Sequence, residues 1–321
     1  MDQAVALRLH EAMLLTRLTE ERLVKLFRQG HTMGSVYRSL GQEATACATA
    51  MALNPEDIIG PMIRDLGAML VRGVQPEEVF LQYLGRATSP TAGRDHNNHF
   101  GGLARGIVAP SSMLGALVPV MAGVALAFRQ RNEPRVAMTW IGDGGSSTGA
   151  FYEGMNFAVV QRLPLIVVGE ANGFAFSTPP ERQMGVPFAT RAQGAFTLVV
   201  DGNDAAEVYE AARTARQRCL DGQGPVFLVC ETFRLAGHAE HDDQRYVDPA
   251  LLEAWRRKDP IPRFATWMSG QGWAPEPELA ARLEGALSAA ADRALAAPWP
   301  EPRELAAGLF ASDGPLTPHG S

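Results

Sequence analysis

Residues 142–178 read GDGGSSTGAFYEGMNFAVVQRLPLIVVGEANGFAFST, and this stretch decides the fold. An apolar strand, RVAMTWI at 135–141, runs into the glycine cluster, a helix follows from about Thr148, and a second apolar run, PLIVVG, ends shortly before Asn172. A strand, a glycine-rich turn, a helix and a strand in this order predict a parallel βαβ unit. Asp143 and Asn172 follow the two strands, so we expect both at the same edge of the sheet.

The pattern continues beyond this unit. A strand over 195–202 (AFTLVVDG), a helix after Asn203 and Asp204, and a strand over 224–231 (GPVFLVCE) predict a second βαβ repeat. Alternation of this kind predicts an α/β fold with a doubly wound, mostly parallel sheet flanked by helices. The expected organisation is an N-terminal helical region (1–86), an α/β core that binds diphosphate (87–248), and a C-terminal helical region with a frayed tail (249–321).

Two local predictions concern the borders of the core. Residues 54–57 (NPED) are typical of a turn or a helix start. Ser111 and Ser112 are expected to cap a long buried helix rich in small residues, within 113–128.

Composition excludes several classes of function. The 321 residues carry a net charge of −6 with a pI near 5.7, which argues against a nucleic-acid-binding protein. The longest apolar runs are too short for a membrane span, and the amphipathic N-terminus does not resemble a signal peptide. Cys47, Cys219 and Cys230 lack metal-ligand or redox spacing, so we expect reduced thiols in a cytoplasmic protein.

The glycine cluster allows three phosphate-binding interpretations. A dinucleotide fingerprint would need glycine at Ser147, and a Walker A loop would need lysine at Ala150. In the third, Asp143 and Asn172 are oxygen ligands of Mg²⁺, together with a backbone carbonyl such as that of Phe174. The structural alternative is that Asp143 caps the following helix and Asn172 fills a turn. We favour the cation site because both residues lie at adjacent strand ends.

Polar residues elsewhere offer further candidates. His96 and His99 lie in a loop over 88–102 (TSPTAGRDHNNHFGG), where a hydrogen-bonding role at a site mouth is favoured over a zinc site. Arg64, taken alone, is more consistent with a surface or ion-paired arginine than with a functional one. Arg234 and His238 follow the strand at 224–231, so they should approach the same sheet edge as Asp143.

Several motifs in fixed order resemble one known family. GDG at 142–144 with Asn172 resembles the thiamine-diphosphate signature, and it is followed by VDGND at 200–204, GPVFLVCETFR at 224–234 and KDPI at 258–261. Over about residues 14–264 the chain is similar to the alpha subunit of the decarboxylating component of 2-oxo acid dehydrogenase complexes, of the branched-chain or pyruvate type.

The resemblance assigns expected roles to named residues. It implies that Asp143, Asn172 and the Phe174 carbonyl hold Mg²⁺, and that His238 and His99 are catalytic. Further residues are expected around the cofactor: Gly144 and Gly145 donating amides to the diphosphate, Arg64, Arg234 and His238 beside it, and Leu114 beneath the bend of the cofactor.

The same resemblance implies an activity and its partners. With thiamine diphosphate and Mg²⁺, a 2-oxo acid is oxidatively decarboxylated and the acyl group passes to the lipoyl group of an acyltransferase. A beta subunit in an α₂β₂ assembly is expected to supply the glutamate that activates the cofactor. The alternatives are an acetoin dehydrogenase or another thiamine-diphosphate enzyme subunit, or a non-catalytic regulatory subunit of the same fold. Ile63 and Ala171 depart from the family pattern, and no serine follows His238 as a phosphorylation site over 239–247.

Overall fold

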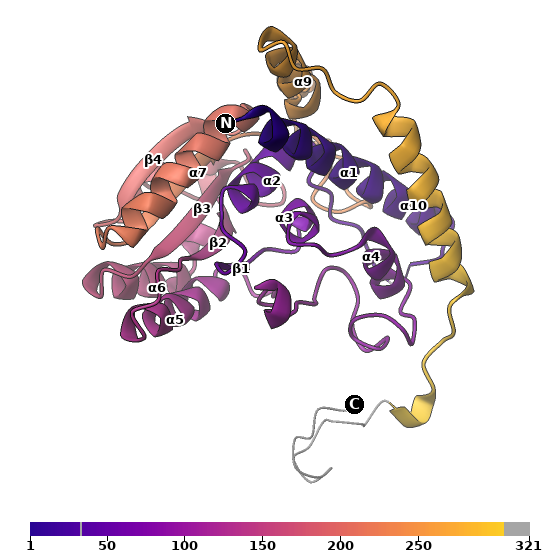
Figure 1. Ribbon diagram of the computed structural model, residues 1–321, viewed down its shortest axis with the longest axis horizontal. Helices are drawn as coiled ribbons and strands as arrows, with labels where there is room; N and C mark the ends of the chain where they lie inside the picture. The colour runs from indigo at the N-terminus through magenta and orange to yellow at the C-terminus, as the bar shows by residue number, and fades with distance from the viewer. Residues whose placement is uncertain (33, 305–321) are drawn as a thin grey trace.

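The fold is built on one parallel sheet, seen in a computed structural model that describes residues 1–32 and 34–304. In the described residues the five-stranded sheet has the order β1-β2-β3-β5-β4, and every neighbouring pair is parallel (Figure 1). The strands are β1 (Ile58–Gly60), β2 (Ala137–Gly142), β3 (Leu165–Ala171), β4 (Phe196–Asp201) and β5 (Val226–Glu231). The predicted α/β fold is therefore confirmed.

Helices cover both faces of the sheet, and further helices precede and follow the strands in the chain. The α-helices are α1 (Gln3–Arg28), α2 (Glu43–Met51), α3 (Leu66–Val71), α4 (Pro76–Tyr83), α5 (Leu117–Gln130), α6 (Gly149–Val160), α7 (Ala205–Leu220), α8 (Pro249–Arg256), α9 (Pro260–Gly270) and α10 (Leu279–Ala296). In Figure 1, α5 and α6 lie together on one side of the sheet, and α10 runs beside α1 and reaches α4. No helix within the described residues is both long and apolar enough to cross a membrane.

Both faces of the sheet are buried, which explains the apolar runs of the central strands. In β2, Ala137 and Ile141 pack into the cluster formed with α5 and α6, while Met138 and Trp140 pack into the larger cluster that includes α1, α2 and α7. Side chains of a strand alternate between its two faces, so a strand covered on both sides needs apolar residues at successive positions.

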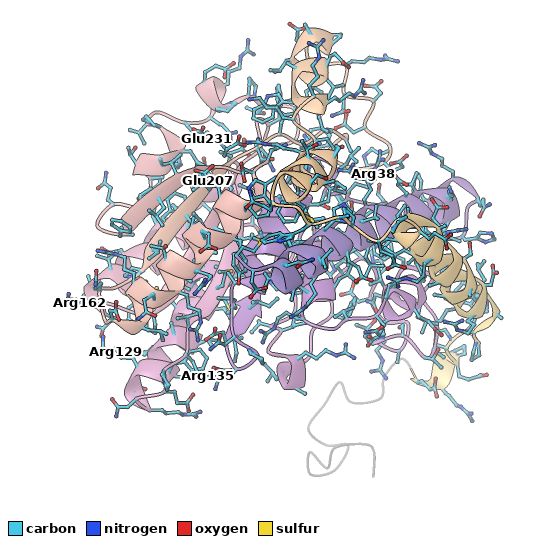
Figure 2. All side chains as sticks on the ribbon, turned by 45° about the horizontal axis from the view of Figure 1, so that its top comes forward. Arg38, Arg129, Arg135, Arg162, Glu207 and Glu231 are labelled. Carbon is cyan, nitrogen blue, oxygen red and sulfur yellow. The ribbon has the colours of Figure 1, made fainter. Side chains whose placement is uncertain are left out.

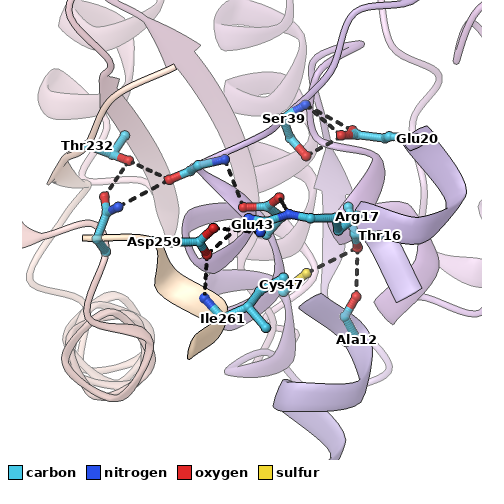
Figure 3. A network of polar contacts seen from close by, with 12 residues as sticks. Ala12, Thr16, Arg17, Glu20, Ser39, Glu43, Cys47, Thr232, Asp259 and Ile261 are labelled. Carbon is cyan, nitrogen blue, oxygen red and sulfur yellow. Dashed lines mark hydrogen bonds and ion pairs between the residues drawn. The ribbon is translucent and has the colours of Figure 1, made fainter. Parts of the chain in front are cut away.

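A buried polar network joins the N-terminal and C-terminal helices (Figure 3). Arg17 of α1 donates to Glu43 at the start of α2 at 2.6 Å, and to Asp259, which caps α9, at 2.6 Å. The second oxygen of Glu43 accepts the Gly41 amide at 3.0 Å. This network fixes the turn before α2, and that turn carries Gln42 toward the end of β3.

The structure adds a strand that the sequence did not predict and corrects one local prediction. Residues 58–60 form the edge strand β1 directly after the turn at 54–57, and three residues are too few for a periodic sequence signal. Helix α5 begins only at Leu117, with Ala116 at its N-cap and no side-chain cap, so Ser111 and Ser112 do not cap it. They lie instead in the wall of a cavity. The tail predicted to be frayed, 312–321, falls outside the described residues.

Candidate active site

Two oxygen-bearing side chains meet where β2 and β3 end. The strands are parallel, with Gly142 opposite Glu170, so Asp143 and Asn172 leave the sheet at the same edge. Asp143 Oδ1 accepts the Gly144 amide at 2.7 Å, while its Oδ2 is buried and has no hydrogen-bond partner among the described residues. Asn172 repeats the arrangement: Nδ2 donates to Gln42 Oε1 at 3.1 Å and the buried Oδ1 is without a partner in the described chain.

Two buried oxygen atoms without hydrogen-bond partners destabilise the fold unless a positively charged group binds them. Burial raises the pKa of the Asp143 carboxyl to about 6, against the lowering effects of the Gly144 amide and the arginine cations. A hard divalent cation would satisfy both oxygens, since carboxylate, amide and carbonyl oxygens are its usual ligands. Nowhere in residues 1–32 and 34–304 do three His, Cys, Asp or Glu side chains gather as a metal cluster, so the donor set fits Mg²⁺ better than zinc.

The turn after Asn172 requires glycine. Gly173 has φ +92°, and a Cβ on it would lie 2.7 Å from the Phe233 ring. Phe174 follows, with its ring 6.0 Å from that of Phe233 and 5.3 Å from that of Tyr246. These ring contacts fix the backbone at Phe174, whose carbonyl accepts no hydrogen bond from the described residues. It is therefore available as a third oxygen.

The glycines at 144 and 145 are needed for close packing. A Cβ on Gly144 would lie 2.6 Å from Cβ of Ala175, and one on Gly145 would lie 2.7 Å from Ile141 Cδ1. The Gly144 amide is already engaged with Asp143. The Gly145 amide makes no hydrogen bond within the described residues, so it is the one available to an anion.

These groups face a cavity of about 490 Å³ at the carboxyl ends of the strands. Its wall combines the turn at 62–64, the segment 111–118, the ends of β2 and β3, and the loop after β5. Of the predicted residues, the following line it: Arg64, Leu114, Asp143, Gly144, Gly145, Asn172, Phe174, Arg234 and His238. His99 does not line it but lies one side chain behind the wall, where its Nε2 contacts Ser112 Oγ at 2.6 Å.

Two buried arginines supply positive charge to the cavity. Arg64 donates to the carbonyls of Arg38 at 2.6 Å and His238 at 3.0 Å, and no acidic side chain of the described chain forms an ion pair with it. Arg234 donates to the Phe176 carbonyl at 2.8 Å. Burial, with the Arg234 charge next, lowers the pKa of Arg64 to about 10, so it stays cationic at neutral pH. Arg64 is thus buried and is not a surface ion-paired residue.

Two acids beside Arg64 were not found from the sequence. Asp65 and Glu170 are fully buried near each other. Asp65 Oδ2 accepts the Met62 amide at 2.8 Å and Glu170 Oε1 accepts the Thr45 hydroxyl at 2.7 Å, while Asp65 Oδ1 and Glu170 Oε2 have no hydrogen-bond partner among the described residues. Burial raises the pKa of both carboxyls, and the neighbouring Glu170 charge raises the pKa of Asp65 further. A signal existed: Glu170 is a charged residue inside an apolar strand. Its partner, from a distant loop, could not be inferred.

Loop residues 234–246 hold His238 in place. Asp242 Oδ2 accepts the His238 amide at 2.6 Å and the Tyr246 hydroxyl at 2.6 Å. The imidazole meets the rings of Phe176 and Tyr37 edge to face, with centroids 4.8 and 5.5 Å away. Burial first, and then the charges of Arg64 and Arg234, lower the pKa of His238 to about 4. His238 therefore presents a neutral imidazole to the cavity at neutral pH.

Three other arginines, Arg129, Arg135 and Arg162, are not among the residues that line the cavity. Figure 2 shows Arg129, Arg135 and Arg162 near one another at one end of the molecule, far from Arg38. Arg129 donates to the Gln161 carbonyl, which ends α6, and Arg135 donates to the Glu56 carbonyl at 2.6 Å. These side chains bind backbone carbonyls in the loops that precede the strands. The positive charge that an anion would meet in the cavity therefore comes from Arg64 and Arg234.

The fold and the cavity at its strand ends define a doubly wound α/β protein with a ligand site at the carboxyl edge of the sheet. The chain belongs to the family described as the dehydrogenase E1 component, whose model matches residues 10–303. Membership confirms the class of enzyme that the motifs indicated and implies thiamine diphosphate as its cofactor.

Named relatives fall into two groups. The chain is 36% identical over 272 residues to the pyruvate dehydrogenase E1 component subunit alpha of Bacillus cereus, covering 83% of this chain and 71% of that subunit. It is 35% identical over 272 residues to the corresponding subunit of Bacillus subtilis, again covering 83% of this chain and 71% of that subunit. It is 31% identical over 277 residues to the mitochondrial 2-oxoisovalerate dehydrogenase subunit alpha 2 of Arabidopsis thaliana, covering 85% of this chain but only 58% of the plant subunit.

Proposed function

We propose that this chain is the alpha subunit of the decarboxylating component of a 2-oxo acid dehydrogenase. With a beta subunit it would decarboxylate a 2-oxo acid oxidatively and pass the acyl group to the lipoyl group of an acyltransferase partner. One observation carries the proposal: the buried oxygens of Asp143 and Asn172, unpaired among the described residues, lie in a cavity with the cations of Arg64 and Arg234. That arrangement suits a diphosphate bound through a divalent cation.

The residues present fit thiamine diphosphate and Mg²⁺. Asp143 Oδ2, Asn172 Oδ1 and the Phe174 carbonyl would hold the cation. The diphosphate would meet the following groups: the Gly144–Gly145 turn, Arg64, Arg234 and His238. Leu114, whose side chain lies in the cavity wall and is 60% exposed, offers an apolar surface beneath the organic part of the cofactor. When bound, thiamine diphosphate supplies the carbon nucleophile and the electron sink that decarboxylation of a 2-oxo acid needs.

His238 would act at the reacting end as a neutral imidazole. It can accept a proton or orient an oxygen of the substrate through a hydrogen bond, but at neutral pH in the free chain it is not an imidazolium donor. A bound diphosphate would offset the charges of Arg64 and Arg234 that lower its pKa. Binding of the cofactor would therefore raise the pKa of His238 and make proton donation easier.

The site would be completed by the beta subunit. The carboxylates that line the cavity in the described chain, Asp143 and Glu170, both lie at the strand ends, where the cation would bind. Leu114, Met113 and Phe176 line the same cavity, yet they are 60%, 68% and 48% exposed. Large exposed apolar side chains around a cavity suit a surface that another chain covers. An α₂β₂ assembly and a glutamate from the beta subunit are parts of this proposal.

Pyruvate and branched-chain 2-oxo acids are the two substrate candidates, because relatives named for both match the chain. Residues 242–246 (DDQRY) follow His238 in the loop but do not indicate either substrate. Asp242 and Tyr246 are instead engaged in holding His238 and Arg234. Co-expression with the beta subunit, followed by decarboxylation assays on a panel of 2-oxo acids, tests the activity and the substrate class together. Failure to turn over any 2-oxo acid would contradict the proposal.

The cation site has a separate test. Asp143→Ala should abolish Mg²⁺-dependent binding of thiamine diphosphate, measured by calorimetry, while circular dichroism stays unchanged. Asp292→Ala, which removes an exposed carboxylate on α10, is the matched control and should bind as the parent does. Equal affinity in Asp143→Ala and the control would refute the site.

A further inference from the structure

A two-residue hairpin places the ring of Phe176 in the cavity wall. Ala175 and Thr178 exchange both backbone hydrogen bonds: the Ala175 amide donates to the Thr178 carbonyl at 2.9 Å, and the Thr178 amide donates to the Ala175 carbonyl at 2.8 Å. Phe176 and Ser177 are therefore the two residues of a tight turn. Phe176 lines the cavity, whereas Ser177 is exposed and is not among the lining residues.

The backbone of Phe176 is unusual for so large a residue. Its φ is +53°, and a positive φ at the first position of a two-residue turn is usually met by glycine, asparagine or aspartate. A bulky side chain is strained in this region, and such residues cluster at functional sites. Glycine would fit the turn without strain, so the contacts of the ring, and not the turn, account for phenylalanine at this position.

Hydrogen bonds hold both ends of the turn. Arg234 Nη2 donates to the Phe176 carbonyl at 2.8 Å, and Gln183 Nε2 donates to the Thr178 carbonyl at 3.3 Å. Arg234 is itself buried and also donates to the Ala236 carbonyl at 3.1 Å. The backbone that carries the ring therefore cannot withdraw from the wall without breaking a hydrogen bond to a buried arginine.

The ring lies beside the imidazole that would act at the reacting end. The centroids of the Phe176 and His238 rings are 4.8 Å apart, and the two rings meet edge to face. Tyr37, which also contacts the imidazole, is not among the residues that line the cavity. Phe176 is 48% exposed, so it is the ring in contact with His238 that a ligand in the cavity would meet.

We propose that Phe176 is a specificity-determining residue that narrows the cavity beside His238 and selects a 2-oxo acid with a small side chain, such as pyruvate, over a branched-chain acid. The inference rests on the proposed function, since it concerns the substrate of that same site. The cavity of about 490 Å³ has to hold the cofactor as well as the substrate, so a ring fixed at this position leaves little room for a branched substituent. A difference of one methylene group is enough to change turnover in an apolar pocket strongly.

The test measures kcat/KM for pyruvate and for 2-oxoisovalerate on the full chain, purified with its beta subunit, with thiamine diphosphate, Mg²⁺ and a lipoylated acceptor. The parent should prefer pyruvate. Phe176→Ala, which removes the ring and keeps a Cβ on the same backbone, should shift the ratio toward 2-oxoisovalerate about tenfold or more. Phe176→Leu should shift it less, because part of the apolar bulk remains. Ser177→Ala, in the same turn, is the control and should leave the ratio unchanged.

A merely structural role of the ring predicts a different result. If Phe176 only holds the turn or the imidazole in place, Phe176→Ala will lower kcat/KM equally for both substrates and the ratio will not move, which overturns the inference. A parent that prefers 2-oxoisovalerate overturns it as well. Thermal unfolding separates misfolding from altered selection, and Phe176→Leu keeps an apolar contact on His238 if the alanine variant does not fold. A parent that turns over no 2-oxo acid would overturn the proposed function itself.

Discussion

Gln42 offers a sharp test of how the cation site is oriented. Its Oε1 accepts Asn172 Nδ2 at 3.1 Å, and its side chain is 1% exposed. This bond decides which end of the Asn172 amide faces Asp143. Gln42→Met keeps the length and approximate shape of the side chain but removes the acceptor. Asn172 Nδ2 then has no partner in a buried position, and the amide can turn so that its nitrogen, which is no metal ligand, replaces the oxygen.

The expected loss follows from the cost of an unsatisfied buried donor, about 1–3 kcal/mol. If the amide must be held in its unfavourable orientation for the cation to bind, this cost appears in the Mg²⁺ affinity as a loss of about fivefold to a hundredfold. The assay is a calorimetric titration of Mg²⁺ into the full chain with its beta subunit, at saturating thiamine diphosphate.

Gln82→Met is the matched control. Gln82 is also fully buried and accepts from Thr91 Oγ1 at 2.9 Å, so the same substitution there removes a similar hydrogen bond away from the cavity. Both variants should lose stability, but only Gln42→Met should lose Mg²⁺ affinity. Equal Mg²⁺ affinity in the two variants would show that Gln42 does not orient Asn172 for a cation.

Three further predictions follow from other parts of the chain. Arg17→Met leaves the buried Glu43 carboxylate without its cation and should lower the free energy of unfolding by about 3–5 kcal/mol in urea titrations, whereas Arg282→Met, at an exposed ion pair, should leave the free energy of unfolding close to that of the parent. Burial raises the pKa of Glu20 to about 8, above its unfolded value near 4.5; the protonated form therefore favours the fold, and its contribution is lost as the pH rises from about 4.5 through 8. Glu20→Gln should flatten that part of the stability profile, and parallel profiles for parent and variant would contradict the assignment. The His238 imidazole, with a pKa of about 4 in the free chain, should titrate at higher pH once pyrophosphate and Mg²⁺ are bound, as followed by NMR; an unchanged midpoint would mean that the diphosphate does not reach Arg64 and Arg234.

Local sequence patterns were sufficient to predict the strands at the core of the fold. β2 and β3 are covered on both faces, so their apolar runs are nearly continuous, and the glycine cluster between them marks the turn. The same logic placed Asp143 and Asn172 at one edge, because parallel neighbours end together. β1 was not predicted because a strand of three residues shows no periodicity. The start of α5 was misplaced because Ser111 and Ser112, which resemble helix caps in the sequence, lie in the cavity wall instead.

Contacts between distant parts of the chain could not be predicted. Gln42 and Asn172 are 130 positions apart, and nothing local to either residue indicates the other. The partnership of Asp65 with Glu170 depends on how the turn after β1 packs on β3, which is decided by the burial of both segments. His99 was predicted as a functional residue, but its hydrogen-bond partners, Asp95 and Ser112, become visible only in three dimensions.

The acid pair explains how Arg64 can remain available to an anion inside the protein. Buried arginines usually have a carboxylate partner, because an unpaired charge in the interior is costly. Arg64 has carbonyl partners instead, and Asp65 and Glu170 are near enough to favour its charged form without binding it. Because burial raises the pKa of both acids, their neutral forms are favoured, and they offset less of the positive potential of Arg64 and Arg234 than two ionised carboxylates would. If both acids were ionised, that potential would be largely cancelled, and the attraction for a diphosphate would be weaker.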